Sequence, residues 1–245
     1  MEWREDGVLL SMRPHGEGSA IIEVFTGGHG RHFGVVRGGA SRKLAPILQP
    51  GAQLALAWRA RLEDQIGVFL AEPVRSRASV LADPLALSGL TAACALLHLA
   101  LPERDPHPHL YHRTMALMDA MATGVDWVGE YLRWEMLLLD EIGFGLDLSR
   151  CALTGARDDL AFVSPRTGRA VSRDAAGEWA PKLLPLPQAL MGQGPVNRPD
   201  AAQALAITGH FLTRGLGGTD VRFALPESRN RLLARLARGQ AMPEG

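Results

Sequence analysis

The chain has 245 residues with equal numbers of basic and acidic side chains, 26 of each, so its formal net charge is zero. Hydrophobic residues make up 47% of the chain and charged residues 21%, proportions typical of a folded domain rather than of a disordered tail. These values exclude a uniformly basic nucleic-acid coat, and any electrostatic binding surface must come from local clustering of charge.

Short strands separated by glycine-bearing turns are predicted for the first 77 residues. In residues 53–61 apolar and polar side chains alternate, with Leu54, Leu56 and Trp58 on one face. Four similar segments are expected at residues 7–12, 20–25, 32–37 and 65–73. Five short strands, with a longer connection between the third and the fourth, favour a small closed barrel of the oligonucleotide-binding (OB) kind. An SH3-like barrel is the structural alternative, because periodicity does not distinguish the two.

After residue 77 the pattern becomes helical. Helices are predicted at residues 83–101, 107–122, 126–143, 198–216 and 226–238. The intervening residues 146–182 are marked by Gly, Pro and Ser and predict a small β-rich insertion. The sequence therefore predicts an α+β protein. Its first domain is expected at residues 1–77, and a mostly helical domain that carries the insertion is expected at residues 78–245.

The connection after the third predicted strand, GVVRGGASRKL at residues 34–44, has the glycines and cations of a phosphate-binding loop. A nucleotide-hydrolysing P-loop requires Gly, then Lys, then Ser or Thr, whereas Lys43 is followed here by Leu44 and is not preceded by Gly. Nucleotide hydrolysis is therefore rejected. Arg37, Arg42 and Lys43 leave a positively charged connection, which suits either a sugar-phosphate backbone or a solvated surface loop.

Metal and catalytic chemistry find little support in the sequence. Two segments have the spacing of zinc-ribbon knuckles, but their four ligand positions carry Cys151, Thr154, Ser172 and Ala175. One thiolate does not hold tetrahedral zinc. Three neighbouring histidines fit a polar helix start better than a metal site: His107, His109 and His112. Without a nucleophile motif or an assigned acid–base pair, we expect no metal, no cofactor and no enzymatic activity.

The cysteines and the apolar segments indicate the cellular compartment in which the protein is expected. Cys94 and Cys151 lie far apart and form no disulfide framework, which is typical of a reducing environment. The first residues have no apolar core of a secretory signal, and the longest apolar run is too short to span a bilayer. We therefore expect a cytoplasmic protein without membrane contact.

Several segments together resemble the RecO family, the recombination mediators of bacterial DNA repair. Three of them match the amino-terminal OB barrel of that family in order and spacing: GVLLSMRPHGEGSAIIEVFT, GGHGRHFGVVRGGASRK and LQPGAQLAL. Two more are similar to the helix and hairpin of its zinc-ribbon-like insertion: YLRWEMLLLDEIGFGLDLSRCALTG and DLAFVSPRTGRAVS. The resemblance extends from about residue 3 to about residue 238. This chain departs from it at the insertion, where the zinc ligands of many relatives are missing.

The resemblance implies a DNA repair and recombination mediator. Such a protein binds single- and double-stranded DNA, anneals complementary strands, and assists the loading of RecA onto strands coated by the single-stranded-DNA-binding protein (SSB). It works with the ring-forming partner RecR, contacts RecA indirectly, and is associated with the nucleoid in the cytoplasm.

The resemblance also assigns DNA-facing residues, which follow the predicted third strand and the first turn: Arg13, Arg31, Arg37, Arg42 and Lys43. Strand alternation adds Arg59 and Arg61, which face away from Leu54, Leu56 and Trp58. His32, Phe33 and Trp58 are candidates for base stacking, and Phe33 and Trp58 fit the barrel core equally well.

A protein-interaction adaptor is the alternative function. In that case the barrel binds a partner ring and the helical domain docks an acidic tail, with little affinity for DNA. Near-zero net charge keeps this alternative open, because the chain as a whole does not attract DNA electrostatically.

Overall fold

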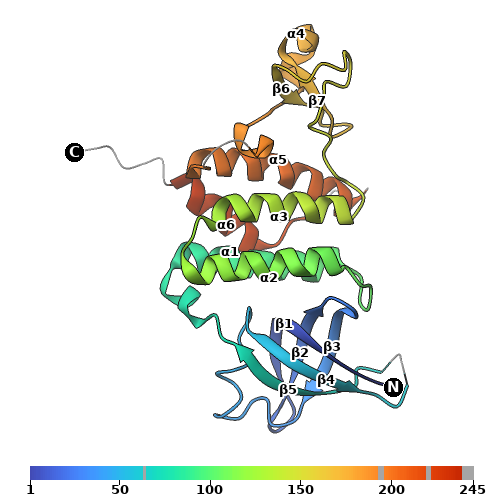
Figure 1. The fold of residues 1–245 in the computed structure, drawn as a ribbon, viewed down its shortest axis with the longest axis vertical. Coiled ribbons are helices and arrows are strands. Elements are labelled where there is room, and N and C mark those ends of the chain that lie inside the picture. The colour runs from blue at the N-terminus through green and yellow to red at the C-terminus, as the bar shows by residue number, and fades with distance from the viewer. Residues whose placement is uncertain (63–64, 193–195, 219–221, 239–245) are drawn as a thin grey trace, which may run out of the picture. The chain divides into compact units, whose positions relative to one another are not determined.

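The computed structural model describes residues 1–62, 65–192, 196–218 and 222–238. Within these residues the chain forms two compact units, Met1–Val125 and Asp126–Gly245 (Figure 1). The first unit contains a closed five-stranded barrel followed by two helices. The second contains a helical bundle that carries a small sheet. The protein is therefore of the α+β class, as the sequence predicted.

The barrel closes in the order β1-β2-β3-β5-β4, with β4 returning to β1. Its strands are β1 (Glu2–His15), β2 (Ser19–Thr26), β3 (Gly30–Val36), β4 (Gln53–Arg59) and β5 (Val68–Arg75). All neighbouring pairs are antiparallel except β3 and β5, which meet in parallel where Val35 pairs with Val68. This is the OB-fold, and it settles the choice between the two barrels that the sequence left open.

Alternation along the strands builds the barrel core. Leu54, Leu56 and Trp58 of β4 point inward and are buried, while Ala55 and Ala57 between them face outward. β1 is longer than expected, because its first residues pair with the whole of β4 from Glu2 opposite Arg59 to Val8 opposite Gln53. The outward-facing residues of this first part of β1 are charged, so the sequence showed no apolar alternation there and the strand was not predicted.

Two helices pack against the barrel within the first unit. After the short 3-10 turn η1 (Ala78–Ala82), they are α1 (Pro84–Ala100) and α2 (Pro108–Thr123). The side chain of Asp83 caps α1 by accepting hydrogen bonds from the backbone N–H groups of Leu85 and Ala86. α1 contacts β1 and α2 contacts β2. The expected domain boundary at residue 77 therefore marks the change from strands to helices, whereas packing joins α1 and α2 to the barrel.

In its described residues, the second unit is a bundle of three long helices with a small inserted sheet. Its long helices are α3 (Trp127–Glu141), α5 (Arg198–Gly217) and α6 (Glu227–Arg238). The insertion contains β6 (Leu160–Val163), β7 (Ala170–Ser172), α4 (Arg173–Ala176), η2 (Gly177–Lys182) and β8 (Leu184–Pro185), and η3 (Gln188–Met191) leads back to the bundle. The three strands form a sheet in the order β7-β6-β8. The predicted β-rich insertion is thus confirmed.

A buried ion pair joins the helices of this bundle. Arg229 of α6 donates from Nε to one oxygen of Glu135 in α3 and from Nη2 to the other, at 2.9 and 2.6 Å. Thr208 of α5 donates to the same carboxylate. Because both charges are buried, removing one partner would leave the other unpaired in a medium of low dielectric constant.

Candidate nucleic-acid interface

One wall of the barrel is covered by the helices of the first unit. β2 is buried on both faces: Ile22 and Val24 lie in the barrel core, while Glu23 and Phe25 lie on the outer face. The Phe25 ring packs edge-on against Tyr111 of α2 with centroids 5.7 Å apart. OB-folds commonly bind nucleic acid on strands 2 and 3. In this chain the outer face of β2 is closed to a ligand.

Arg31 lies under this cover, and here the structure corrects the sequence-based prediction. Its guanidinium donates from Nη1 to Glu23 and from Nε to the backbone oxygen of Leu101, the latter at 3.0 Å. The Arg31 side chain is only 8% exposed and that of Glu23 only 1%. His98 of α1 also lies 3.0 Å from the Glu23 carboxylate. A DNA strand has no access to Arg31, which serves the packing of α1 on the barrel instead.

In the described part of the first unit, the opposite wall, formed by β4, β5 and the first half of β1, is left bare by α1 and α2 over most of its length. At its end, Arg75 of β5 pairs with Asp119 of α2 at 2.8 Å. Along β5 the side chains of Val68, Leu70 and Val74 are 37%, 65% and 51% exposed. A groove of about 440 Å³ crosses this wall and is lined by residues of β1, β3, β4 and β5 and of the loop after β3. We call it the β4–β5 groove. Its lining includes Arg4, Arg37, Leu44, Ala57, Arg59 and Leu70.

Strand register brings the cations of this groove together. Arg4 pairs with Ala57, which pairs in turn with Leu70 on β5. One step along, Arg59 stands between Glu2 and Val68. Side chains that lie opposite each other on antiparallel strands share one face of the sheet. The groove therefore has a basic end with apolar patches. Arg4 belongs to this basic end, although the sequence analysis did not identify Arg4 as a candidate.

Glu2 is the acidic residue at this basic end. Arg59 Nε lies 3.0 Å from one Glu2 oxygen, and Arg4 Nη2 lies 3.7 Å from the other. The hydrogen bond from Arg59 holds the pKa of Glu2 below its usual value, helped by the charges of Arg59 and Arg4. The pair is exposed to solvent, so its contribution to folding is small. Glu2 instead reduces the positive potential of the groove.

The loop after β3 is a set of tight turns. Gly39 N–H donates to Val36 O at 3.1 Å, and Ser41 N–H donates to Gly38 O at 2.9 Å. Gly38 has φ +69°, a left-handed conformation that glycine adopts without strain. Its cations Arg37, Arg42 and Lys43 are exposed, and none makes an ion pair with a residue that the structure describes. Among the described residues, no helix begins in this loop.

Arg13 and Arg61 are the remaining two residues of the predicted interface. Arg13 is exposed on β1 opposite Ile21, close to the β1–β2 turn. That turn is joined to the loop after β3 by a 3.2 Å hydrogen bond from Ala40 N–H to Gly18 O. Arg61 is exposed two residues beyond the end of β4. Neither residue lines the β4–β5 groove.

A second hollow, of about 400 Å³, opens at one end of the barrel and is rich in aromatic rings. We call it the mouth pocket; its lining includes Trp3, Gly28, His29, His32, Trp58 and Arg104. Burial lowers the pKa of His32 to about 4, aided by the charges of Arg104 and His29. The sequence named His32 and Trp58 as stacking candidates, but Trp58 is a core residue only 2% exposed. Nothing in the sequence marked Trp3 and Arg104 as site residues, because only tertiary packing brings them to this pocket.

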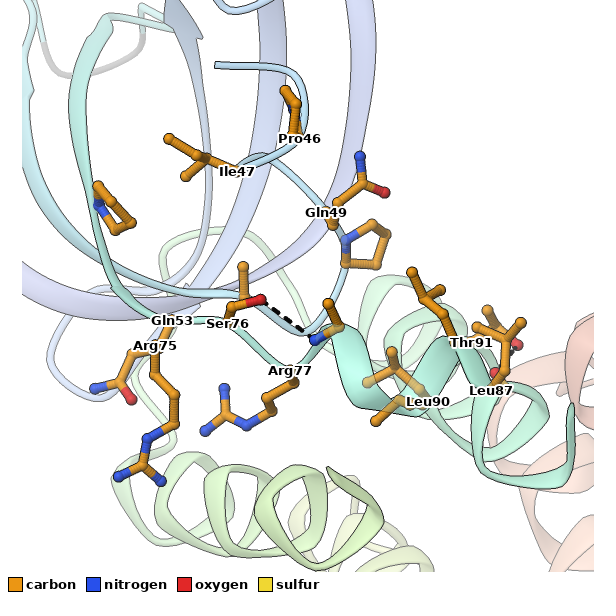
Figure 2. Close-up of a pocket in the computed structure, with 16 residues that line it drawn as sticks. Pro46, Ile47, Gln49, Gln53, Arg75, Ser76, Arg77, Leu87, Leu90 and Thr91 are labelled. Carbon is orange, nitrogen blue, oxygen red and sulfur yellow. Dashed lines mark hydrogen bonds between the residues drawn. The ribbon is translucent and has the colours of Figure 1, made fainter. Parts of the chain in front are cut away.

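A third hollow, of about 310 Å³, is mainly apolar and lies beside α1 (Figure 2). Figure 2 shows Pro46 and Ile47 of the loop before β4 on one side and Leu87 and Leu90 of α1 on the other. At its base Arg77 donates from Nη1 to Gly51 O at 2.7 Å and pairs with Asp119 of α2. This apolar pocket is suited to a hydrophobic side chain rather than to a phosphate.

The insertion does not provide the donors of a zinc site. Cys151 is buried, and its Sγ accepts hydrogen bonds from the N–H and hydroxyl of Ser172 at 3.4 and 3.5 Å. Ala175 packs against the same small core. Among the described residues no group of three or more His, Cys, Asp and Glu side chains is placed to hold a metal. One thiolate, two hydroxyls and a methyl group do not fit the four-ligand set of tetrahedral zinc.

Comparisons with known proteins agree on one family. The family model described as "Recombination protein O N terminal" matches residues 1–77, and "Recombination protein O C terminal" matches residues 81–222. A protein of Cereibacter sphaeroides named DNA repair protein RecO is 63% identical over 97% of this chain and 99% of its own length. Proteins of the same name from Dinoroseobacter shibae and a Jannaschia species are 57% and 56% identical over at least 97% of both chains. In the described part of the chain, no helix is long and apolar enough to cross a membrane.

Proposed function

Because this chain belongs to the RecO family of DNA repair proteins, we propose that it binds DNA electrostatically through the β4–β5 groove and the adjoining loop 37–43. It acts as a mediator, without catalysing a bond-breaking reaction. It binds single and double strands, anneals complementary strands, and assists RecA loading onto SSB-coated DNA together with RecR. Its place of action is the nucleoid in the cytoplasm.

The observation that carries this proposal is the convergence of Arg4, Arg37 and Arg59 on one groove. They come from three different places in the chain, and the same groove exposes Leu70. Guanidinium groups bind phosphate oxygens well, and each phosphate that is neutralised releases counterions. A groove of this composition supports binding along a sugar-phosphate backbone.

Loop 37–43 extends the cationic surface. Arg42 and Lys43 add two exposed charges, and Arg13 and Arg61 are exposed as well. Arg31 is left out, because it is buried against Glu23. Contacts of this kind carry no base sequence information, which suits annealing, because the protein must accept a strand of any sequence.

A salt titration with a labelled mixed-sequence oligonucleotide tests the proposal. Changing Arg42 and Lys43 together to Ala is expected to weaken binding and to reduce the slope of log K against log salt by about one to two. The matched control changes Arg231 and Arg235, two exposed arginines of α6 in the second unit, to Ala. An equal effect of both double variants, or an unchanged slope in the loop variant, would contradict the proposed interface.

Partner docking is the second candidate function, and the apolar pocket beside α1 favours it. Leu81 lines this pocket and is 59% exposed. An apolar side chain of another protein would be buried against it. Repeating the titration with and without RecR and SSB separates the two functions. Tight, salt-dependent binding by the chain alone supports DNA binding, and binding that requires the partners supports the adaptor.

A further inference from the structure

We propose that the mouth pocket holds one unstacked nucleobase of a single strand whose backbone lies along the β4–β5 groove. This inference rests on the proposed function and makes it more specific. It gives the interface a contact that a paired duplex cannot make.

The mouth pocket offers flat aromatic surfaces at a place open to solvent. Trp3 lies parallel to His29, with ring centroids 4.2 Å apart and an interplanar angle of 10°. On the barrel side Trp58 lies 6.0 Å from Trp3 at 19°. His29 has 38% of its side chain exposed, and Trp3 is only partly buried. An exposed stack of this kind accepts a further ring of any base, because every base has a π-face.

His32 is a polar residue where the core alone would favour a hydrocarbon ring. It is 4% exposed and lies edge-on to Trp58, with centroids 4.7 Å apart. Neither ring nitrogen has a hydrogen-bond partner among the described residues, an arrangement that folded proteins usually avoid. With its pKa near 4, the imidazole is neutral at physiological pH and offers one donor and one acceptor. The edges of nucleobases carry both kinds of group and can satisfy it.

Arg104 is held at the pocket by a strained backbone. Its φ is +63°, although it is not glycine. Its N–H donates to Arg31 O at 2.8 Å, and its Nη2 donates to Gln65 O at 2.9 Å. Its guanidinium lies 5.9 Å from the centroid of the Trp58 ring. Strained positions of this kind concentrate at functional sites, and a guanidinium beside the pocket is suited to the phosphate of the bound nucleotide.

The packing of this loop explains how the position is fixed. A Cβ atom at Gly30 would come within 2.1 Å of Asp105 O, so only glycine lets the loop between α1 and α2 approach β3 so closely. The mouth pocket is also continuous with the proposed track of the backbone, since Glu2 lines both the pocket and the β4–β5 groove. A strand that follows the groove therefore brings its bases to the barrel mouth.

The test compares two single strands of equal length and charge, one with all its bases and one with abasic sites throughout its central part. Wild-type protein is expected to bind the intact strand about tenfold more tightly at the same salt concentration, a typical effect of one stacked base. When a central base is replaced with 2-aminopurine, the fluorescence of this base should be quenched on binding. Trp3→Leu removes the aromatic stack, and His32→Phe removes the hydrogen-bonding partner of the base edge. Arg104→Gly removes the cation beside the pocket. The first two should abolish the preference without changing the salt slope.

Arg37→Ala is the matched control, because it lies in the groove and should weaken binding of both strands equally. Equal affinity of the wild-type protein for both strands, with a normal salt slope, would overturn the base pocket and leave the proposed function intact. Failure to bind either strand would overturn both. Full preference and full quenching in Trp3→Leu or His32→Phe would also overturn the pocket. Should one variant not fold, the other and the wild-type comparison still decide.

Discussion

The two walls of the barrel are built from similar alternating strands but differ in what covers them. On the covered wall, Arg31 and Glu23 form an ion pair buried beneath α1. On the bare wall, Arg59 and Glu2 form a pair of the same chemistry in contact with water. The comparison teaches that an arginine on the outer face of a strand is not thereby available to DNA. What packs over the strand decides whether its charge stabilises the fold or faces a ligand.

The largest expected effect is on the covered wall. Arg31→Met leaves Glu23 buried without its main partner, and we expect the free energy of unfolding to fall by about 3–5 kcal/mol. Urea denaturation measures the change. The salt slope of DNA binding, measured where the variant is folded, should stay at the wild-type value.

A double variant provides the control for this prediction. Changing Glu23 to Leu together with Arg31→Met removes both charges, and most of the lost stability should return. If the single variant is as stable as the wild-type protein, Arg31 does not secure α1 on the barrel and the contrast between the walls is lost.

A smaller effect is expected at the barrel mouth, where the two walls meet. The pKa of His32 is about 4 in the folded chain against 6.5 for an ordinary histidine, because of burial and the charges of Arg104 and His29. The unfolded chain therefore takes up a proton first, and stability is lost as the pH falls from about 6.5 towards 4. Between pH 7.5 and 5 the loss should be about 2 kcal/mol.

Comparison with His32→Phe isolates this contribution from that of the other titrating groups. The difference in free energy of unfolding between the two proteins, followed by urea denaturation at several pH values, should change over that interval and level off below pH 4. A difference that is the same at pH 7.5 and pH 5 would show that His32 is not shielded from solvent.

The smallest effect is expected on the bare wall. Glu2→Gln removes the acid between Arg4 and Arg59 and should tighten DNA binding about threefold at low salt, with less effect at high salt. The melting temperature should not change measurably, because the pair is exposed. Glu17→Gln, on the turn between β1 and β2, is a control with the same change of charge. Equal tightening in both variants would point to net charge rather than to the groove.

Much of the fold followed from periodicity. Strand alternation in 53–61 predicted β4, and helical spacing with the Asp83 cap predicted α1 to within a residue or two at each end. The first part of β1 was missed, because Glu2, Arg4 and Asp6 face outward and leave a strand without an apolar pattern. The insertion was recognised from its turn residues, and its lack of zinc donors was visible in the residues themselves.

The sequence by itself determined that the first domain is a small barrel of short strands, and it gave the order of the helices, the family and the cations on the loop after β3. Only the tertiary structure decided that Arg31 is buried, that Arg4 joins Arg37 and Arg59, and that Arg104 reaches the barrel mouth. The physical reason is the range of the interactions. Alternation, capping and turn formation depend on neighbours along the chain. Burial and the convergence of charges depend on contacts between segments up to about a hundred residues apart, and no local sequence pattern indicates which segments will meet.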